Sequence, residues 1–315
     1  MQAELEYIYA VHKAGSFSKA AENLYITQPA LSMSVKKIES SLGMPLFDRS
    51  ARPLQLTEAG RIYIAMIENM IALEEDAFNR IHDIHELKTG NLCVGGSHYI
   101  NAYILPDAIA AFSSKYPGIS LELVEASSAT LADMLTERLI DITFSCRDDL
   151  IANFGHTPAF TDHILLAVSP EILNLDCGLS AHEVLDGKHL ESGCPAIPAK
   201  ALEGLEYILL SEGNNLHDRA MTIFQEAGIR PRIRLEISQL ATSYYLARAK
   251  LGAAFISDRM IFPQENALKF YKVDSKITER QFYAVLPRRE YTSLAVRAFI
   301  KIIASALRQK VFREV

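Results

Sequence analysis

The first 58 residues of the chain combine short apolar runs at helical spacing with turn signals. Leu5 and Ile8 mark one face of a first helix, which ends at Gly15. A second helix is predicted over residues 19–24, with the serine at position 16 or 18 as its N-cap. A break of three residues, Tyr-Ile-Thr, follows this second helix.

A third helix is predicted after the break, and both of its ends are marked. Thr27 caps its first turn, and Pro29 falls within that turn, where a missing N–H costs little. Gly43 ends the run. The apolar positions at helical spacing are Leu31, Val35, Ile38 and Leu42. They give the third helix a face to bury against the second.

A short basic hairpin is predicted over residues 48–56, and a long helix after it. Thr57 caps this helix, which runs to about Leu87 and would be ~45 Å long for ~30 residues. Its apolar positions recur near a period of about 3.5 residues. They are Ile64, Ile67, Ile71, Phe78, Ile81 and Ile84. Another copy of the chain is the expected partner for this stripe, and a core helix within one domain is the alternative.

The pattern changes from Asn91 onward to short buried strands that alternate with helices. The strands cover residues 92–95, 119–124 and 142–146, and the helices cover residues 102–115 and 130–138. This βαβαβ order predicts a parallel sheet with right-handed crossovers. The same order returns over residues 207–256, and a strand over 281–286 with a helix over 294–308 completes the first lobe. Two similar α/β lobes are therefore expected.

Composition places the chain among globular proteins but does not point to nucleic acid. The sequence has 315 residues, of which 49% are apolar and 22% charged, and its net charge is −6. Residues 1–60 hold six lysines and arginines against six aspartates and glutamates. The first ten residues lack the apolar stretch of an export signal, and no apolar run approaches the ~18 residues of a membrane span. A cytoplasmic protein without membrane contact is expected.

The sequence offers no arrangement of residues typical of catalysis or metal binding. The four cysteines lie far apart with no C-x-x-C pair, so a zinc site or disulfide framework is not predicted; a redox pair of Cys177 and Cys194 is the alternative. There is no G-x-S-x-G motif, no P-loop and no metal-spaced histidine pair. We therefore predict no enzyme, no catalytic residue, no metal and no cofactor. A solute-binding protein would carry an export signal and lack the first 60 residues.

The N-terminal 60 residues resemble the DNA-binding signature of the LysR-type transcriptional regulators, and the match covers nearly all of residues 5–60. The matching segments are Gly15-Ser16-Phe17-Ser18-Lys19-Ala20-Ala21-Glu22-Asn23-Leu24, Thr27-Gln28-Pro29-Ala30-Leu31-Ser32, Ile38-Glu39, Leu42-Gly43, Leu46-Phe47-Asp48-Arg49, Arg52 and Leu56-Thr57-Glu58-Ala59-Gly60. Leu105-Pro106, Pro117-Gly118-Ile119 and Asp141 resemble the effector domain of that family more loosely.

The resemblance implies three parts of the chain. An all-α winged helix-turn-helix domain occupies residues 1–58, and a linker and dimerisation helix follows over residues 59–89. An α/β effector-binding domain of the two-lobed, periplasmic-binding-protein-like type II class occupies residues 90–315. Its lobe I covers about residues 90–163 and 270–315, and its lobe II covers about residues 164–269. The implied partners are double-stranded DNA, a small-molecule effector, a second copy through the linker helices and, as a pair of dimers, a homotetramer; RNA polymerase is a further partner that this class allows.

In a helix-turn-helix the second helix enters the major groove with its N-terminal residues toward the bases. Gln28 suits the N6/N7 edge of adenine, and neighbouring apolar side chains suit a thymine methyl. Met33 stands where many members of the family have arginine or another polar residue, so readout there would be apolar. The expected DNA-contacting residues are Ser18, Thr27, Gln28, Pro29, Ala30, Ser32, Met33, Lys36, Lys37, Arg49 and Arg52.

In two-lobed α/β domains, ligands bind where strand ends and helix N-termini face the cleft. The expected effector-binding residues are Ser97, His98, Asn101, Ser127, Ser128, Thr130, Cys146, Arg147, Asn214 and Asn215. Hydroxyl groups and helix N-termini favour an anion such as a carboxylate, to which Arg147 adds a charge-assisted bond. Serine and asparagine before a helix also serve as caps, and that alternative stays open for each of them.

Overall fold

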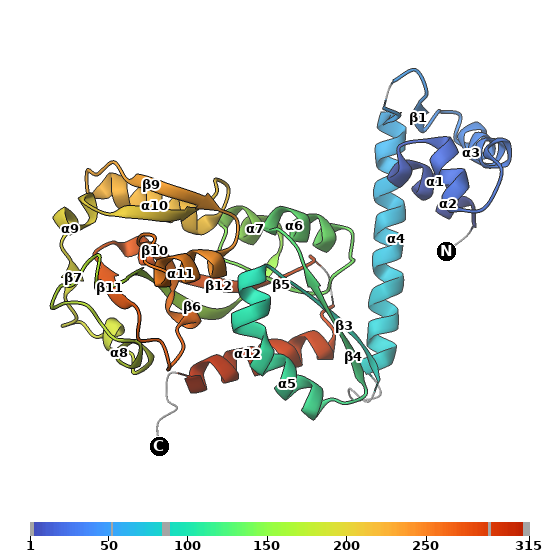
Figure 1. Cartoon of the computed structure of the whole chain (residues 1–315). Helices are drawn as coiled ribbons and strands as arrows, with labels where there is room; N and C mark the ends of the chain where they lie inside the picture. Colours follow the sequence, from blue (N-terminus) through green and yellow to red (C-terminus); the bar gives the residue numbers. More distant parts are fainter. Residues whose placement is uncertain (1–2, 52, 84–88, 289–290, 311–315) are drawn as a thin grey trace. The chain divides into compact units, whose positions relative to one another are not determined.

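The computed structural model describes residues 3–51, 53–83, 89–288 and 291–310. The chain divides into two units, Met1–Ile84 with Arg289–Tyr291, and His85–Arg288 with Thr292–Val315 (Figure 1). Among the described helices, none is both long enough and apolar enough to cross a membrane.

The first unit contains the three predicted helices, the hairpin and the long helix. Its elements are α1 (Ala3–Ala14), α2 (Phe17–Asn23), α3 (Gln28–Leu42), the antiparallel pair β1 (Phe47–Asp48) and β2 (Gln55–Leu56), and α4 (Glu58–Asp83). Apolar side chains from α1 to α4 form one core, in which Ile8, Leu31 and Val35 are fully buried. The second helix begins two residues earlier than predicted. Ser16 is at its N-cap position in an extended conformation but makes no side-chain cap bond.

The ends of α3 and the start of α4 follow the predicted capping chemistry. The Thr27 hydroxyl accepts a bond from the Ala30 N–H at 3.4 Å, and Gly43 ends α3 in the left-handed conformation with φ of 70°. At α4, the Thr57 hydroxyl accepts from the Gly60 N–H at 3.0 Å. A Cβ on Gly60 would lie 2.0 Å from the Leu46 carbonyl oxygen. The long helix therefore starts in direct contact with the base of the hairpin.

The face of α4 that packs inside the first unit differs from the prediction. Ile64 and Ile67 are buried in the core with α1 and α3, so this part of the predicted dimer stripe is covered by the domain itself. Phe78 and Ile81 of the predicted stripe are exposed. A second apolar row is exposed as well, because the 3.5-residue period does not tell which face is already covered. This exposed row consists of Ile62, Met66, Met70 and Leu73. The predicted end of the helix near Leu87, and Ile84, lie outside the described residues.

The second unit consists of two α/β lobes. The first holds β3 (Gly90–Gly96), the π turn η1 (Ile100–Ile104), α5 (Leu105–Lys115), β4 (Ile119–Glu125), α6 (Ser128–Thr136), β5 (Thr143–Ser145), α7 (Asp148–Asn153), β12 (Glu279–Leu286) and α12 (Leu294–Lys310). β3 and β4 are parallel as predicted, but β5 pairs antiparallel with β12, so the lobe is not purely parallel. α12 packs against α5, β3 and the strand β6 (Gly155–Val168) (Figure 1). Pro106 lies in the first turn of α5, where its missing N–H costs little.

The second lobe repeats the arrangement with different connections. It holds α8 (Ala181–Leu185), η2 (Lys188–Leu190), β7 (Ala196–Ile197), α9 (Ala199–Glu203), β8 (Glu206–Leu210), α10 (Asn215–Glu226), β9 (Arg232–Ile237), α11 (Leu240–Arg248), β10 (Ala254–Ser257), η3 (Asp258–Met260), β11 (Lys269–Val273) and η4 (Lys276–Thr278). β8 and β9 are parallel, while β10 and β11 both pair antiparallel with β6. α11 packs against β8 and β10.

A long strand that the sequence pattern did not predict, β6 (Gly155–Val168), runs through both lobes. Up to His163 it pairs with β12 of the first lobe, and from Ile164 onward it pairs with β10 and β11 of the second. The predicted boundary at residue 270 lies inside β11, which pairs with residues 165–168 of β6; the chain returns to the first lobe only after this strand. Pro158 and a bulge at the next residue, Ala159, interrupt the pairing of β6 with β12.

Candidate DNA-binding helix and effector cavity

The start of α3 presents an exposed row of side chains opposite its buried face. Leu31, Val35 and Ile38 are buried in the core of the first unit. Seven of the predicted DNA-contacting residues are exposed on or just before this helix: Thr27, Gln28, Pro29, Ala30, Met33, Lys36 and Lys37. Ser18 is exposed on α2, and Ser32 is partly buried. The exposed face leaves base-reading and phosphate-contacting groups free of the core.

Among the predicted DNA-contacting residues, Lys37 and Arg49 form ion pairs, and the two side chains are held by contacts of different strength. Lys37 pairs with Glu4 at 3.0 Å between exposed side chains, a contact that contributes little and that a phosphate can replace. Arg49 is bound more closely, because it donates to Glu39 at 3.1 Å and stacks on Phe17 at 4.8 Å from the ring centroid. Glu39 also accepts the N–H of Leu46 at 2.8 Å. Arg49 therefore braces the hairpin against α3.

The assignment of Arg52 to the hairpin wing lies outside the described residues. For Arg49, the pair with Glu39 leaves the guanidinium about half exposed, and its contact with DNA stays a prediction.

The second unit contains a cavity of about 650 Å³ between its two lobes. The predicted effector residues that line it are Ser97, His98, Ser127, Ser128, Cys146, Arg147, Asn214 and Asn215. They come from both lobes and from elements far apart in the sequence. The cavity therefore brings together most of the predicted site, while contact with an effector stays a prediction.

Two predicted effector residues do not line the cavity and have structural contacts instead. The Asn101 side-chain amide donates to the Val124 carbonyl at 3.1 Å, and this bond joins the π turn to β4. The Thr130 hydroxyl lies 2.9 Å from the Ser127 hydroxyl, which also caps the Thr130 N–H at 3.2 Å. Ser127 is therefore the N-cap of α6, and the Thr130 hydroxyl contacts this cap, while a role of either residue in effector binding stays a prediction.

Three helices begin at the cavity, so their N-terminal dipole ends point toward it. The lining residues at these ends are Ser127, Ser128 and Ala129 of α6, Asn214, Asn215 and Leu216 of α10, and Gln239 and Leu240 of α11. Asn214 caps α10 by accepting from the Leu216 N–H at 3.0 Å. Unpaired N–H groups and a partial positive charge at such ends favour negatively charged ligands.

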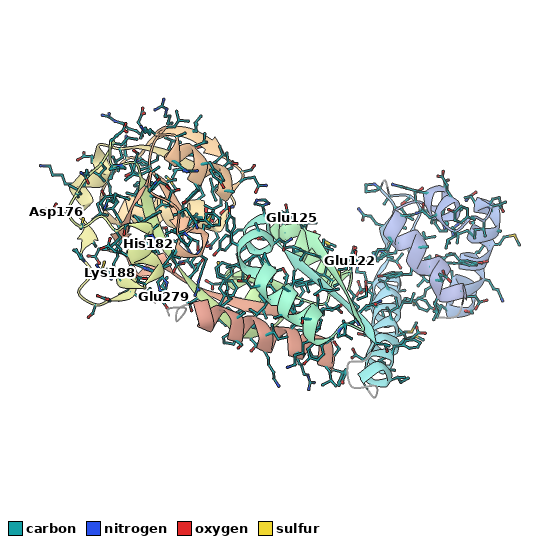
Figure 2. All side chains as sticks on the ribbon, turned by 60° about the horizontal axis from the view of Figure 1, so that its bottom comes forward. Glu122, Glu125, Asp176, His182, Lys188 and Glu279 are labelled. Carbon is teal, nitrogen blue, oxygen red and sulfur yellow. The ribbon has the colours of Figure 1, made fainter. Side chains whose placement is uncertain are left out.

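The charged side chains at the cavity are largely paired with each other. Arg147 donates to both oxygens of Asp149, at 3.0 and 2.9 Å, and these hydrogen bonds lower the pKa of Asp149. His98 lies 3.3 Å from Glu125, which ends β4 (Figure 2). The guanidinium of Arg147 is therefore less available to an anion than the sequence alone indicated.

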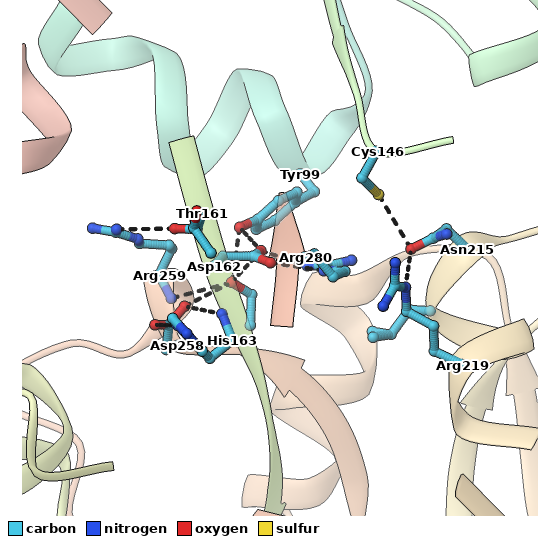
Figure 3. A network of polar contacts seen from close by, with 12 residues as sticks. Tyr99, Cys146, Thr161, Asp162, His163, Asn215, Arg219, Asp258, Arg259 and Arg280 are labelled. Atoms are coloured by element: carbon cyan, nitrogen blue, oxygen red, sulfur yellow. Dashed lines mark hydrogen bonds and ion pairs between the residues drawn. The ribbon is translucent and has the colours of Figure 1, made fainter. Parts of the chain in front are cut away.

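A buried polar network at the back of the cavity was missed by sequence reasoning. Arg280 donates to both oxygens of Asp162, at 2.7 and 2.5 Å, and Tyr99 donates to the same carboxylate at 2.6 Å (Figure 3). The Ser257 hydroxyl also donates to the Asp162 carboxylate, at 2.8 Å. Tyr99 and Arg280 also line the cavity, together with Phe144 and Phe282. Desolvation by burial, followed by the charge of Asp162, raises the pKa of Tyr99, so this hydroxyl stays protonated and donates.

One signal in the sequence could have placed Arg280 inside. In the predicted final strand, alternate side chains point to the same face. Phe282 and Ala284 are buried on that face, and Arg280 stands two and four residues before them. A charged side chain on the same face as buried apolar residues needs a buried partner of opposite charge, because burying an unpaired charge is costly.

A second group of contacts joins the lobes at the edge of the cavity. The Cys146 thiol lies 3.3 Å from the side-chain oxygen of Asn215, to which Arg219 also donates at 3.0 Å (Figure 3). All four cysteines are free thiols, so the structure contains no Cys177–Cys194 disulfide. Burial raises the pKa of the Cys146 thiol, and it raises that of Cys93 to about 11. Neither thiol is activated as a nucleophile at neutral pH.

Both units match family models over most of their length. Residues 3–61 match the model described as "Bacterial regulatory helix-turn-helix protein, lysR family", and residues 85–308 match "LysR substrate binding domain". A probable RuBisCO transcriptional regulator of Cyanidioschyzon merolae is 28% identical over 304 residues, covering 94% of this chain and 95% of that protein. The uncharacterized HTH-type transcriptional regulator YcgK of Bacillus subtilis is 26% identical, with coverage of 97% and 94%.

Solved structures share this fold along nearly the whole chain. An OxyR mutant of Corynebacterium glutamicum has a TM-score of 0.59 at 21% identity, covering 99% of this chain and 94% of that one. Full-length CbnR in complex with its target DNA has a TM-score of 0.57 at 19% identity, covering 98% and 99%.

A helix-turn-helix unit followed by a two-lobed ligand-binding domain defines a DNA-binding transcriptional regulator with an effector-binding domain. The chain belongs to the LysR family of such regulators, and it is not an enzyme. The predicted family and fold class are thereby confirmed.

Proposed function

We propose that this regulator binds a specific, two-fold symmetric DNA site through α3 and that an anionic metabolite in the cavity controls its activity. The observation that carries the proposal is the convergence of three helix N-termini, from both lobes, on one cavity of about 650 Å³. Serine and asparagine groups beside them supply hydrogen bonds for carboxylate oxygens. The volume is that of a small-molecule site.

The proposed response follows from the two-lobed arrangement. An effector held by α6 of one lobe and α10 of the other favours the relative angle of the lobes that fits it. Because β6 crosses between the lobes at His163, a change of angle bends the chain at this point. The effector shifts the equilibrium only if it binds the two states unequally.

The assembly is part of the same proposal. The exposed row of α4, together with Phe78 and Ile81, is covered by the same helix of a second copy, and two such dimers join into a tetramer through their effector domains. Each dimer then presents two α3 helices to one DNA site, with RNA polymerase as a further partner on the bound DNA.

Selection of DNA from a random duplex pool at two salt concentrations tests the proposed DNA recognition. Enrichment of a two-fold symmetric site is expected, with affinity that falls as salt rises because Lys36 and Lys37 contact phosphates. Salt-sensitive binding without any enriched site would contradict sequence-specific readout by α3, and absence of binding at both salt concentrations would contradict the proposal as a whole.

The substitution Gln28→Ala is expected to relax the preference at one base pair of each half-site, by about 1–3 kcal/mol, because an adenine-reading amide is lost. Selection repeated with the variant measures this effect. Ser40→Ala, an exposed change near the other end of α3, serves as the control and should leave the selected site unchanged. An identical profile for Gln28→Ala and the parent chain would remove Gln28 from direct readout.

The pair of substitutions Ser97→Ala and Ser128→Ala is expected to weaken effector binding by at least about tenfold, because two hydroxyl groups leave the cavity. A panel of mono- and dicarboxylates, screened by the rise in melting temperature of the full chain, supplies the probe. Thr136→Ala, exposed at the far end of α6, is the control. Undiminished melting shifts in the double variant would contradict the assignment of the cavity, and DNA affinity without effector should not change.

A further inference from the structure

Two histidines and an aspartate that are distant in the sequence meet beside the point where β6 crosses between the lobes. His163 belongs to β6, His189 to η2, and Asp258 opens η3. One oxygen of Asp258, Oδ2, lies 3.3 Å from His163 Nδ1 and 3.1 Å from His189 Nε2. The ligand atoms of all three side chains lie within 4.8 Å of one another. Figure 3 shows Asp258 and His163 beside the buried network.

The other oxygen of Asp258 is held by the fold, and this fixes the direction of the carboxylate. Oδ1 accepts the N–H of His163 at 3.0 Å and lies 3.3 Å from the Ser257 hydroxyl. Oδ2 is left to face the two imidazole rings. Burial by itself opposes ionisation, but the hydrogen bonds from His163 and His189 bring the pKa of Asp258 below its ordinary value.

The charge at this cluster is not balanced by a direct pair with lysine or arginine. Among the ion pairs of the described residues, Asp258 pairs only with the imidazoles of His163 and His189. The neighbouring Arg259 contributes a favourable field, but its guanidinium donates to the Thr161 carbonyl at 3.1 Å. Two imidazoles and one carboxylate are ligand types that suit a divalent transition-metal ion.

Two of the three separations between the donor atoms match those of a tetrahedral metal site. Nitrogen and oxygen ligands bound about 2.0–2.1 Å from a tetrahedral ion lie about 3.3 Å from each other. The two separations at Asp258, 3.1 and 3.3 Å, agree with that value. The side chains of His189 and Asp258 are buried, while that of His163 is 27% exposed. The exposed side leaves a route for an ion and room for a water ligand.

The hydrogen bonding of His189 is incomplete. Its Nδ1 is buried and has no hydrogen-bond partner among the described residues, although the residue is only 6% exposed. The tautomer of a histidine is set by the bond that its other nitrogen makes. In the metal-free protein the bond to Asp258 keeps the ring proton on Nε2. A metal ion at Nε2 would take the place of that proton, and the partnerless Nδ1 would then carry the proton of the neutral ring.

We propose that His163, His189 and Asp258 bind one divalent transition-metal ion, with Zn²⁺ as the preferred ion. The spacing of these residues matches no metal motif, so the sequence predicted no such site. The ion would tie the crossing strand to the second lobe. It would do so next to Ser257, whose hydroxyl bonds Asp162 at the back of the effector cavity. Bound metal would thus restrain the same crossing that the effector bends.

Titration of the full-length chain, stripped of metal with a chelator, tests the site without reference to DNA or effector. Addition of Co²⁺ is expected to give the visible absorption bands of a tetrahedral ion, saturating at one ion per chain, and Zn²⁺ should displace it. Absence of a saturable one-to-one band would overturn the proposal and leave a cluster joined by hydrogen bonds alone.

Matched substitutions locate the ion. His163→Gln and His189→Gln are each expected to weaken Co²⁺ binding by at least about a hundredfold. His182→Gln, on the neighbouring helix α8 and exposed (Figure 2), should bind as the parent chain does. His163 is partly exposed, so its variant is expected to keep the circular dichroism spectrum of the parent chain. If His189→Gln unfolds, Co²⁺ binding by His163→Gln alone tests the proposed site. Undiminished binding by His163→Gln, or an equal loss in His182→Gln, would refute the assignment.

Discussion

Replacement of Arg280 with methionine is expected to lower the free energy of unfolding of the effector domain by about 3–5 kcal/mol, because it leaves the Asp162 carboxylate buried without a cation. Asp162 is fully buried, and Arg280 is 4% exposed. Tyr99 and Ser257 continue to donate to the carboxylate in this variant, but neither carries a charge. The methionine fills part of the space of the arginine stem, so the loss reports mainly on the missing charge.

Urea unfolding of the full chain, followed in the effector domain, measures this loss. Arg234→Met is the control, since Arg234 pairs with Glu206 at 3.1 Å between exposed side chains and should cost less than about 1 kcal/mol. Adding Asp162→Asn to Arg280→Met is expected to restore part of the stability, because the unpaired charge is then absent. A cost for Arg280→Met no greater than that of the control would show that the pair contributes nothing net.

The elements of the first unit were predictable because the signals that define them are local. Thr27, Pro29 and Gly43 mark the ends of α3 within a few residues of the helix itself. The face on which α4 packs was not predictable in the same way. A period of apolar residues locates stripes on a helix but not the neighbour of each stripe, and Ile64 and Ile67 pack within the domain.

The effector cavity was predicted in outline because strand ends and helix starts meet there by the rules of α/β folds. Its buried network was not predicted, because partners such as Arg280 and Asp162 are separated by 118 positions. The cluster at Asp258 was not predicted for the same reason, since His163 is 95 positions away in the sequence. β6, the strand that carries Asp162 and His163, lacks the alternation that predicts a strand, so no reading of local pattern brings these side chains together.

Replacement of two exposed residues on α4, Ile62→Asp and Leu73→Asp, is expected to convert the protein to a monomer at micromolar concentration. The two positions lie three helical turns apart on one face, at 66% and 63% exposure, so the changes leave the core of the domain intact. In a dimer each aspartate would be buried against apolar side chains of the second copy without a partner, which opposes association. Size-exclusion chromatography with light scattering measures the mass.

The same variant connects assembly to DNA binding. A dimer holds two α3 helices on one site, so the second contact forms at high effective concentration, and its loss should reduce affinity for the selected site by at least about a hundredfold. Arg61→Gln with Glu68→Gln, two exposed changes on a different face of α4, is the matched control and should keep both mass and affinity. If the aspartate variant remains a dimer, the exposed row is not the interface. If it is a monomer with full affinity, α3 alone would account for binding, and the symmetric site would lose its physical basis.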